Sequence, residues 1–169
     1  MTTKWNLDPT HSEITFRVKH LMISNVKGSF KSFTAEMEAE DDTFRNAKVT
    51  ATIQTDSIDT NNADRDTHLK SEEFFNAEVN PTITFESDAL NDEITGNLTV
   101  NGVTIPVKLD VDFGGINADP WGNTKAGFSF EGKIKRSDFG LNWNAALEAG
   151  GVMVSDEVKI AGELQFVKA

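Results

Sequence analysis

The chain has 169 residues and 18.6 kDa, with 16 Lys and Arg against 27 Asp and Glu, a formal net charge of -11. This is the length of one domain, so we expect a single domain over residues 1–169. So acidic a chain argues against nucleic acid and anionic membrane surfaces as partners, because both require cationic patches. The absence of cysteine excludes disulfides, thiolate catalysis and thiolate zinc sites.

The first segment, residues 1–12, contains no apolar run of the kind that forms the centre of a secretory signal. No later stretch is long enough to span a bilayer as a helix. We therefore expect a cytoplasmic protein, or a periplasmic one if a leader has been removed. Within this segment Asp8 and Ser12 are expected to form a turn through bonds to the local backbone.

Apolar and polar residues then alternate with the period of a half-buried strand through most of the chain. The alternating runs lie in residues 14–18, 49–53, 94–100, 103–113, 126–134 and 158–166. The phase slips between Phe30 and Phe33, which predicts a bulge or bend near Lys31 and Ser32. We count about eight or nine strands, and their one-sided alternation predicts antiparallel sheets in a barrel or sandwich.

The connections favour an up-and-down barrel with one helical excursion. A helix is expected near residues 62–76, capped by Asn62 or Asp64 and ended before Pro81. Asn101 and Gly102 predict a tight hairpin, and residues 114–123 are typical of a long loop. A closed barrel also removes the exposed strand edges that a long open sheet would leave.

Signals for catalysis are weak. The histidines His11, His20 and His68 have no metal-binding spacing, so we expect neither a metal nor a cofactor. Arg65, Asp66 and His68 form the densest polar cluster and offer a base with an orienting carboxylate. The favoured alternative is a helix start whose Arg and Asp fix a loop over the barrel.

Signals for an apolar ligand are stronger than those for catalysis. The 12 Phe provide a large apolar surface to bury, and without Tyr the chain has no phenolic hydroxyl to bind a polar ligand. His20 continues the inward phase of residues 14–18, and Arg136 continues that of residues 128–134. Both are expected near a barrel mouth, where they would bind the polar end of an apolar ligand. The alternation fits a barrel filled by its own side chains equally well, so the residues alone leave both interiors open.

A set of ordered motifs covers nearly the full length and resembles the YceI-like family. The motifs are residues 5–12, 16–21, 26–30, 57–60, 65–71, 74–75, 81–87, 96–104, 106–107, 136–141 and 158–160. The resemblance implies an extended, lipocalin-like antiparallel β-barrel whose apolar pore holds a polyisoprenoid or similar long-chain amphiphile. It also implies a homodimer.

The leading hypothesis is a non-enzymatic binding or carrier protein for a long-chain isoprenoid lipid, of the polyprenyl or isoprenoid quinone type. The predicted apolar wall consists of Phe16, Val18, Phe30, Phe33, Ile53, Leu69, Phe74, Phe75, Phe85, Leu98, Val100, Phe128, Phe130, Phe139 and Trp143. His20 and Arg136 form the predicted polar mouth. Two alternatives are an enzyme acting on a lipid head group through Arg65, Asp66 and His68, and a ligand-free, stress-related scaffold.

Overall fold

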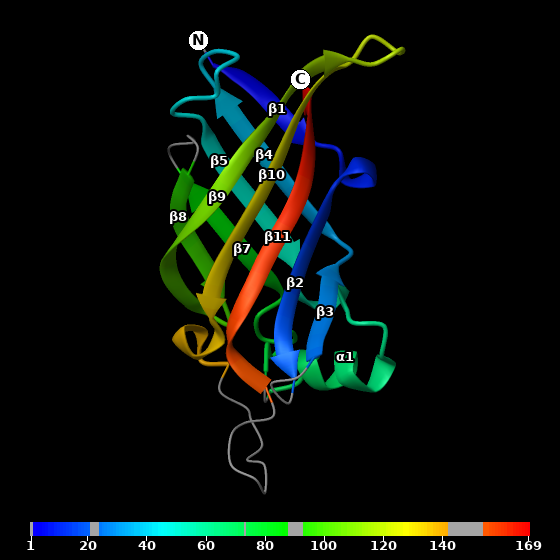
Figure 1. Ribbon diagram of the computed structural model, residues 1–169, viewed down its shortest axis with the longest axis vertical. Coiled ribbons are helices and arrows are strands. Elements are labelled where there is room, and N and C mark those ends of the chain that lie inside the picture. The colour runs from blue at the N-terminus through cyan, green and yellow to red at the C-terminus, as the bar shows by residue number, and fades with distance from the viewer. Residues whose placement is uncertain (1, 21–23, 73, 88–92, 142–153) are drawn as a thin grey trace, which may run out of the picture.

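The computed structural model describes residues 2–20, 24–72, 74–87, 93–141 and 154–169, without the side chains of His20 and Val154. Eight antiparallel strands form a ring in the order β1-β4-β5-β7-β8-β9-β10-β11, which closes through pairing of β1 with β11 (Figure 1). Their bounds are β1 Thr3–Leu7, β4 Phe33–Ala39, β5 Lys48–Gln54, β7 Thr82–Ser87, β8 Glu93–Val100, β9 Val103–Ala118, β10 Thr124–Lys135 and β11 Val154–Lys168. The predicted antiparallel barrel of about eight strands is confirmed.

Three further strands branch from the ring: β2 (Glu13–His20), β3 (Ser24–Phe30) and β6 (Ile58–Asp59). Strand β11 pairs with β1 near its C-terminal end and with β2 along its earlier part, so β2 continues the line of β1. The chain bends at Lys31 between β3 and β4, which confirms the bend predicted from the phase slip.

The expected turn before β2 is present, with the 3-10 helix η1 (Pro9–His11) at its centre. The carboxylate of Asp8 accepts the Thr10 backbone N–H at 3.1 Å, and the Ser12 hydroxyl donates to the Asp8 carbonyl at 2.7 Å. Hydrogen bonds from Thr10, from His11 and from the Lys125 ammonium hold the pKa of Asp8 well below its usual range. The Lys125 Nζ lies 3.0 Å from the Asp8 carboxylate. This contact ties the turn to β10.

The helix is shorter than predicted, since α1 spans only Ala63–Lys70. Asn62 caps it by accepting the Arg65 backbone N–H at 3.0 Å. The Ser71 hydroxyl donates to the His68 carbonyl at 2.5 Å, and Asn76 adopts a left-handed φ of 47°. The helix ends at Lys70 because Ser71 takes an extended ψ of 171° and its hydroxyl bonds the His68 carbonyl, whereas Asn76 turns the chain only further on.

The prediction of a long loop at residues 114–123 is wrong, because β9 continues through Gly114 to Ala118. Gly115, at a φ of 111°, lies opposite Gly127 of β10, and the register shifts there in a bulge. Glycine pairs inside a ladder can mark a bulge as well as a loop. The hairpin at Asn101 and Gly102 is as expected, with φ of 54° and 75°.

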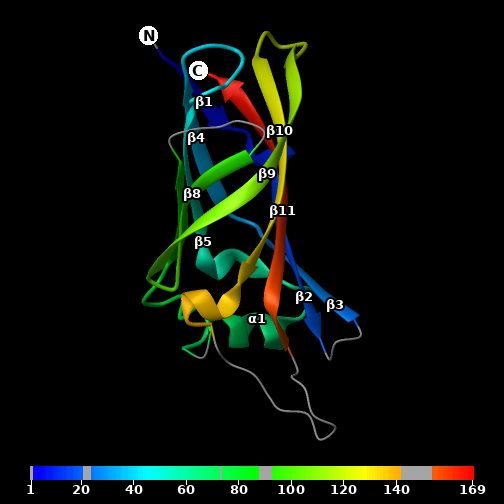
Figure 2. The same cartoon turned by 60° about the vertical axis from the view of Figure 1, so that its left-hand side comes forward.

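Aromatic rings fill the barrel interior near the two termini. The Phe44 ring meets the rings of Trp5, Phe113 and Phe128 edge-on at centroid distances of 5.2 Å each. Phe128 also contacts Phe166 at 6.0 Å. We call these five residues the aromatic plug. Helix α1 lies across the opposite end of the barrel (Figure 2). No helix in the described ranges is long and apolar enough to cross a membrane.

Candidate ligand-binding cavity

The barrel encloses a cavity of about 650 Å³. Inward side chains of every strand in the ring line it, together with residues of β2, β3 and α1. The volume falls in the range of pockets that bind small molecules. Of the two interiors that the alternation left open, the structure has the hollow one.

The described part of the predicted wall faces this cavity. The lining includes Phe16, Val18, Phe30, Phe33, Ile53, Leu69, Phe74, Phe75, Phe85, Leu98, Val100, Phe128, Phe130 and Phe139. Trp143 lies outside the described residues. Contact of these side chains with a ligand stays a prediction.

Further lining residues were missed, although they share the inward phase of the same strands. They include Leu7, Ile14, Met37, Val107, Leu109, Val111, Ile134, Ile160 and Leu164. The alternation that selected Phe128 and Phe130 extends to Ile134 on the same strand, so the signal was in the sequence.

Polar side chains gather at one end of the cavity. Apart from two threonines, Thr15 and Thr34, the polar lining residues in the described ranges lie in α1, in the segment just before it, or in the 3-10 helix η3 (Arg136–Phe139). They are Thr60, Asn62, Asp64, Arg65, His68 and Arg136. The end beside α1 is therefore the polar end, and the aromatic plug closes the other.

The cluster proposed as a catalytic site fixes α1 to β6. Arg65 donates from Nε to the Thr60 hydroxyl at 2.8 Å and from Nη2 to the Thr60 carbonyl at 2.6 Å. The Asp66 carboxylate accepts the Thr60 backbone N–H at 2.9 Å. The His68 ring stands edge-on to Phe74 at 5.1 Å. This is the arrangement of the favoured alternative, in which Arg and Asp hold a segment over the barrel end.

Arg136 is buried, with 7% of its surface exposed. It donates from Nε to the Ser155 carbonyl at 3.0 Å and from Nη1 to the Leu141 carbonyl at 2.6 Å. Burial lowers the pKa of Arg136, and the nearby Asp156 carboxylate opposes that shift. The guanidinium thus holds η3 against the start of β11 while it lines the polar end of the cavity.

The predicted head-group role of Arg136 and His20 stays a prediction. His20 ends β2 opposite Ser24 of β3, and its side chain lies outside the described part of the structure.

Three phenylalanine rings lie over inward-facing glycines of neighbouring strands, which keeps the lumen open. Phe16 pairs with Gly28 across β2 and β3, and Phe130 pairs with Gly162 across β10 and β11. A methyl group on these glycines would come within 2.2 Å and 2.3 Å of the facing rings. Phe85 covers Gly96 in the same way, at 2.5 Å. Because glycine has no side chain, each ring can lie against the wall.

Gly28→Ala is therefore expected to push the Phe16 ring into the lumen and to weaken binding of a pyrene-labelled alkyl chain about tenfold, or about 1.4 kcal/mol. The three atoms nearest to the added methyl all belong to the Phe16 side chain, which can rotate, so the barrel itself should persist. Fluorescence titration measures the affinity. Gly127→Ala is the control, because no atom lies within 4 Å of its added methyl. Equal affinity of the two variants would contradict this account of the glycines.

A family model described as the YceI-like domain matches residues 5–166. A UPF0312 protein of Staphylococcus epidermidis is 43% identical over 166 residues, which cover 97% of each chain. A UPF0312 protein of Staphylococcus aureus is 40% identical over the same share of each chain.

Solved structures also share the fold. The Campylobacter jejuni YceI protein superposes with a TM-score of 0.76 at 34% identity, over 89% of this chain and 90% of that one. A polyisoprenoid binding domain from Saccharophagus degradans has a TM-score of 0.74 over 98% of both chains. Its identity of 14% makes it a likeness of fold alone.

Proposed function

The chain belongs to the YceI-like family, and we propose that it binds and carries a long-chain isoprenoid lipid, such as an isoprenoid quinone. The observation that carries the proposal is the cavity, whose described wall is apolar along the barrel, apart from Thr15 and Thr34, and polar beside α1. The similarity in fold to a polyisoprenoid binding domain supports the class of ligand.

Burial of an apolar chain supplies enough free energy for tight binding without strong polar contacts. At about 0.3 kcal/mol per heavy atom, a chain of about 40 carbons would gain about 12 kcal/mol, which corresponds to nanomolar affinity. Such a chain exposes so much apolar surface that free transfer through water is unfavourable. A carrier that encloses the chain removes that barrier.

The distribution of polar groups favours one orientation of the ligand. The head group would lie beside α1, near Arg65, His68 and Arg136, and the tail would run toward the aromatic plug. Among the lining residues that the structure describes, Asp64 is the one carboxylate, so a neutral or electron-rich head group suits this end. Arg65 and Asp66 both bind Thr60, which favours a binding role over turnover of the head group.

Mass spectrometry of an organic extract tests the proposal. Freshly purified, tag-free protein is extracted with solvent, and native mass spectrometry is run on the same preparation. We expect a prenyl lipid in stoichiometric amount that is unchanged after long incubation. Absence of lipid, together with no uptake of added isoprenoid quinone, would overturn the carrier and favour the scaffold. Turnover of the lipid that is lost in His68→Ala would favour the enzyme.

Two further parts of the proposal are a homodimer, which the resemblance to the family implies, and a cytoplasmic location, which rests on the sequence. Trp121, in the loop after β9, is 81% exposed and offers apolar surface that a second copy would cover. Light scattering of the purified protein measures the assembly directly.

A further inference from the structure

A row of cations crosses the outer wall of this acidic barrel. In the strand register, Lys27 of β3 lies opposite Arg17 of β2, Arg17 lies opposite Lys159 of β11, and Lys159 lies opposite Lys133 of β10. All four residues are exposed. We call them the cationic row.

The cationic row is electrostatically unfavourable in the isolated protein. Neighbouring strands lie about 4.8 Å apart, and like charges directly opposite each other destabilise a sheet. In the part of the chain that the structure describes, Lys133 alone among the four has a carboxylate within 4.0 Å, that of the exposed Glu157. A row of three successive like-charge pairs points to a partner of opposite charge.

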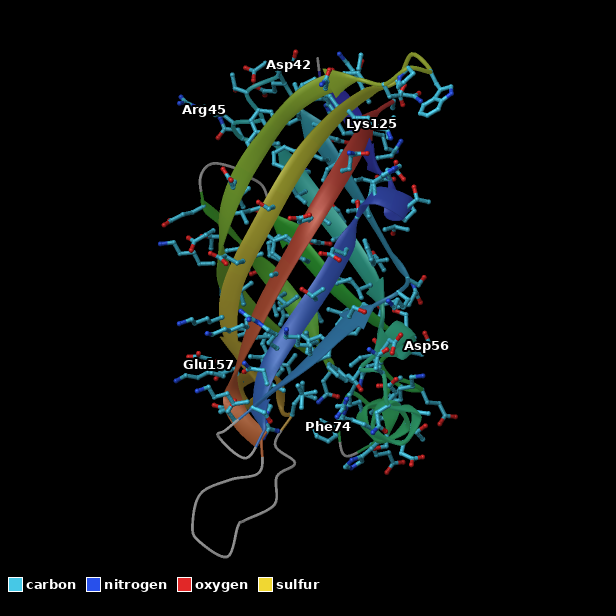
Figure 3. All side chains as sticks on the ribbon, turned by 45° about the vertical axis from the view of Figure 1, so that its right-hand side comes forward. Asp42, Arg45, Asp56, Phe74, Lys125 and Glu157 are labelled. Carbon is cyan, nitrogen blue, oxygen red and sulfur yellow. The ribbon has the colours of Figure 1, made fainter. Side chains whose placement is uncertain are left out.

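The charges on these strands are separated along the barrel. Toward the termini carboxylates lie in facing positions, with Glu13 of β2 opposite Glu163 of β11 and Glu131 of β10 opposite Asp110 of β9. The cationic row lies nearer the end that carries α1. Glu157, which pairs with Lys133, is at that end in Figure 3, whereas Arg45 is at the other.

The cationic row adjoins the polar end of the cavity. Arg17 and Lys27, with Lys31, line a shallow outer hollow of about 330 Å³. Thr15 and Ser29 add hydroxyls to it, and Asp59 is its one carboxylate. Thr60 lines both this hollow and the cavity. A partner bound at the cationic row would therefore lie beside the polar end of the cavity.

We propose that the cationic row docks the polar end of the barrel onto an anionic lipid bilayer. The proposal rests on the carrier function in one respect, because a bilayer is where an isoprenoid lipid is taken up or released. Anionic head groups complement the four cations, and the hydroxyls of the hollow can donate to phosphate oxygens.

Screening limits how far the net charge of -11 opposes this contact at moderate salt. The Debye length is about 8 Å at physiological ionic strength, whereas β10, with its 12 residues, is about 40 Å long. Carboxylates near the termini are therefore screened from a bilayer at the α1 end. The carboxylates at that end, among them Asp64 and Asp66 of α1 and Glu157, are not screened in this way and oppose the contact. In this proposal the four cations of the row outweigh them, against the expectation drawn from total charge.

The test is co-sedimentation with vesicles of phosphatidylcholine alone and of phosphatidylcholine mixed with phosphatidylglycerol. The variant Arg17→Glu with Lys133→Glu alternates the signs along the row. The control, Arg45→Glu with Lys48→Glu, changes the net charge equally near the opposite end, where Figure 3 shows Arg45 and where Lys48 begins β5 opposite Glu38 of β4. The wild type and the control are expected to bind only the anionic vesicles. Each cation near the surface contributes about fivefold, so the row variant should bind at least about 25-fold more weakly.

Three further readouts decide the outcome. Arg17→Glu alone should melt at a higher temperature, because its facing pairs with Lys27 and Lys159 then have opposite charges and the contact of Lys133 with Glu157 is kept. No binding by the wild type, or equal losses in both variants, would overturn the proposal. Loss of self-association instead of vesicle binding would identify a second copy as the partner. The lipid content of an organic extract should be equal in all variants, which separates failed docking from failed cargo binding.

Discussion

Phe130→Asp is expected to empty the barrel of its lipid while the protein stays folded. The Phe130 ring lines the cavity and covers Gly162, and its partners across the two neighbouring strands are Gly162 and Val111, so the substitution places a carboxylate among apolar neighbours. An unpaired charge against hydrocarbon costs at least about 3 kcal/mol, which is a loss of affinity of more than about 100-fold. Lipid in the organic extract, normalised to protein, measures the effect.

Ser129→Asp is the matched control for this variant, because it adds the same charge to the same strand. Ser129 lies between Phe128 and Phe130 and does not line the cavity. Phe128→Asp should lose the lipid as well, with a larger loss of stability, because Phe128 also belongs to the aromatic plug. Lipid retained by folded Phe130→Asp at the level of the control would remove this position from the binding wall.

Phe44→Ala is expected to destabilise the protein by about 3–5 kcal/mol. Phe44 is 1% exposed, and its ring contacts three other rings of the aromatic plug. Its loss leaves a cavity between rings held by three different strands, so the surroundings can collapse only in part. For a domain of this size the melting temperature should fall by about 10 °C, as differential scanning calorimetry measures.

Trp121→Ala provides the comparison for Phe44→Ala. Trp121 is also aromatic, but it is 81% exposed, so its removal should change stability by no more than about 0.5 kcal/mol. A similarly small effect of Phe44→Ala would mean that the aromatic plug does not hold the barrel closed at this end.

The strands were predictable because each has one solvent-exposed, polar face and one apolar face. Residues 103–113 keep strict alternation, and the hairpin at Asn101 and Gly102 fixes their pairing with β8. The continuation of β9 past Gly114 was not predictable in this way. Its glycines signal a loop locally, and only their position opposite Gly127 of β10 shows that they form a bulge.

The inward faces were also predictable, but the open lumen was not. Whether a phenylalanine fills a barrel or lies against its wall depends on the residue opposite it on the next strand. Gly162 faces Phe130 across β10 and β11, and that register becomes known only with the fold. The role of Arg136 is similar, since its acceptors are the carbonyls of Leu141 and Ser155.

Net charge was the least informative sequence property, because it averages over a surface whose charges are separated. Arg17 and Lys159 are far apart in the chain and lie face to face on the barrel. The total of -11 hides that contact.

A crystal structure of the protein grown with an isoprenoid quinone tests the central claim most directly. We predict continuous density for the prenyl chain along the cavity, with its tail toward Phe128 and its head group beside Arg65 and His68. Phe16 and Phe130 should still lie over Gly28 and Gly162. A cavity without the chain at saturating quinone, or quinone bound only on the outer surface, would contradict the account.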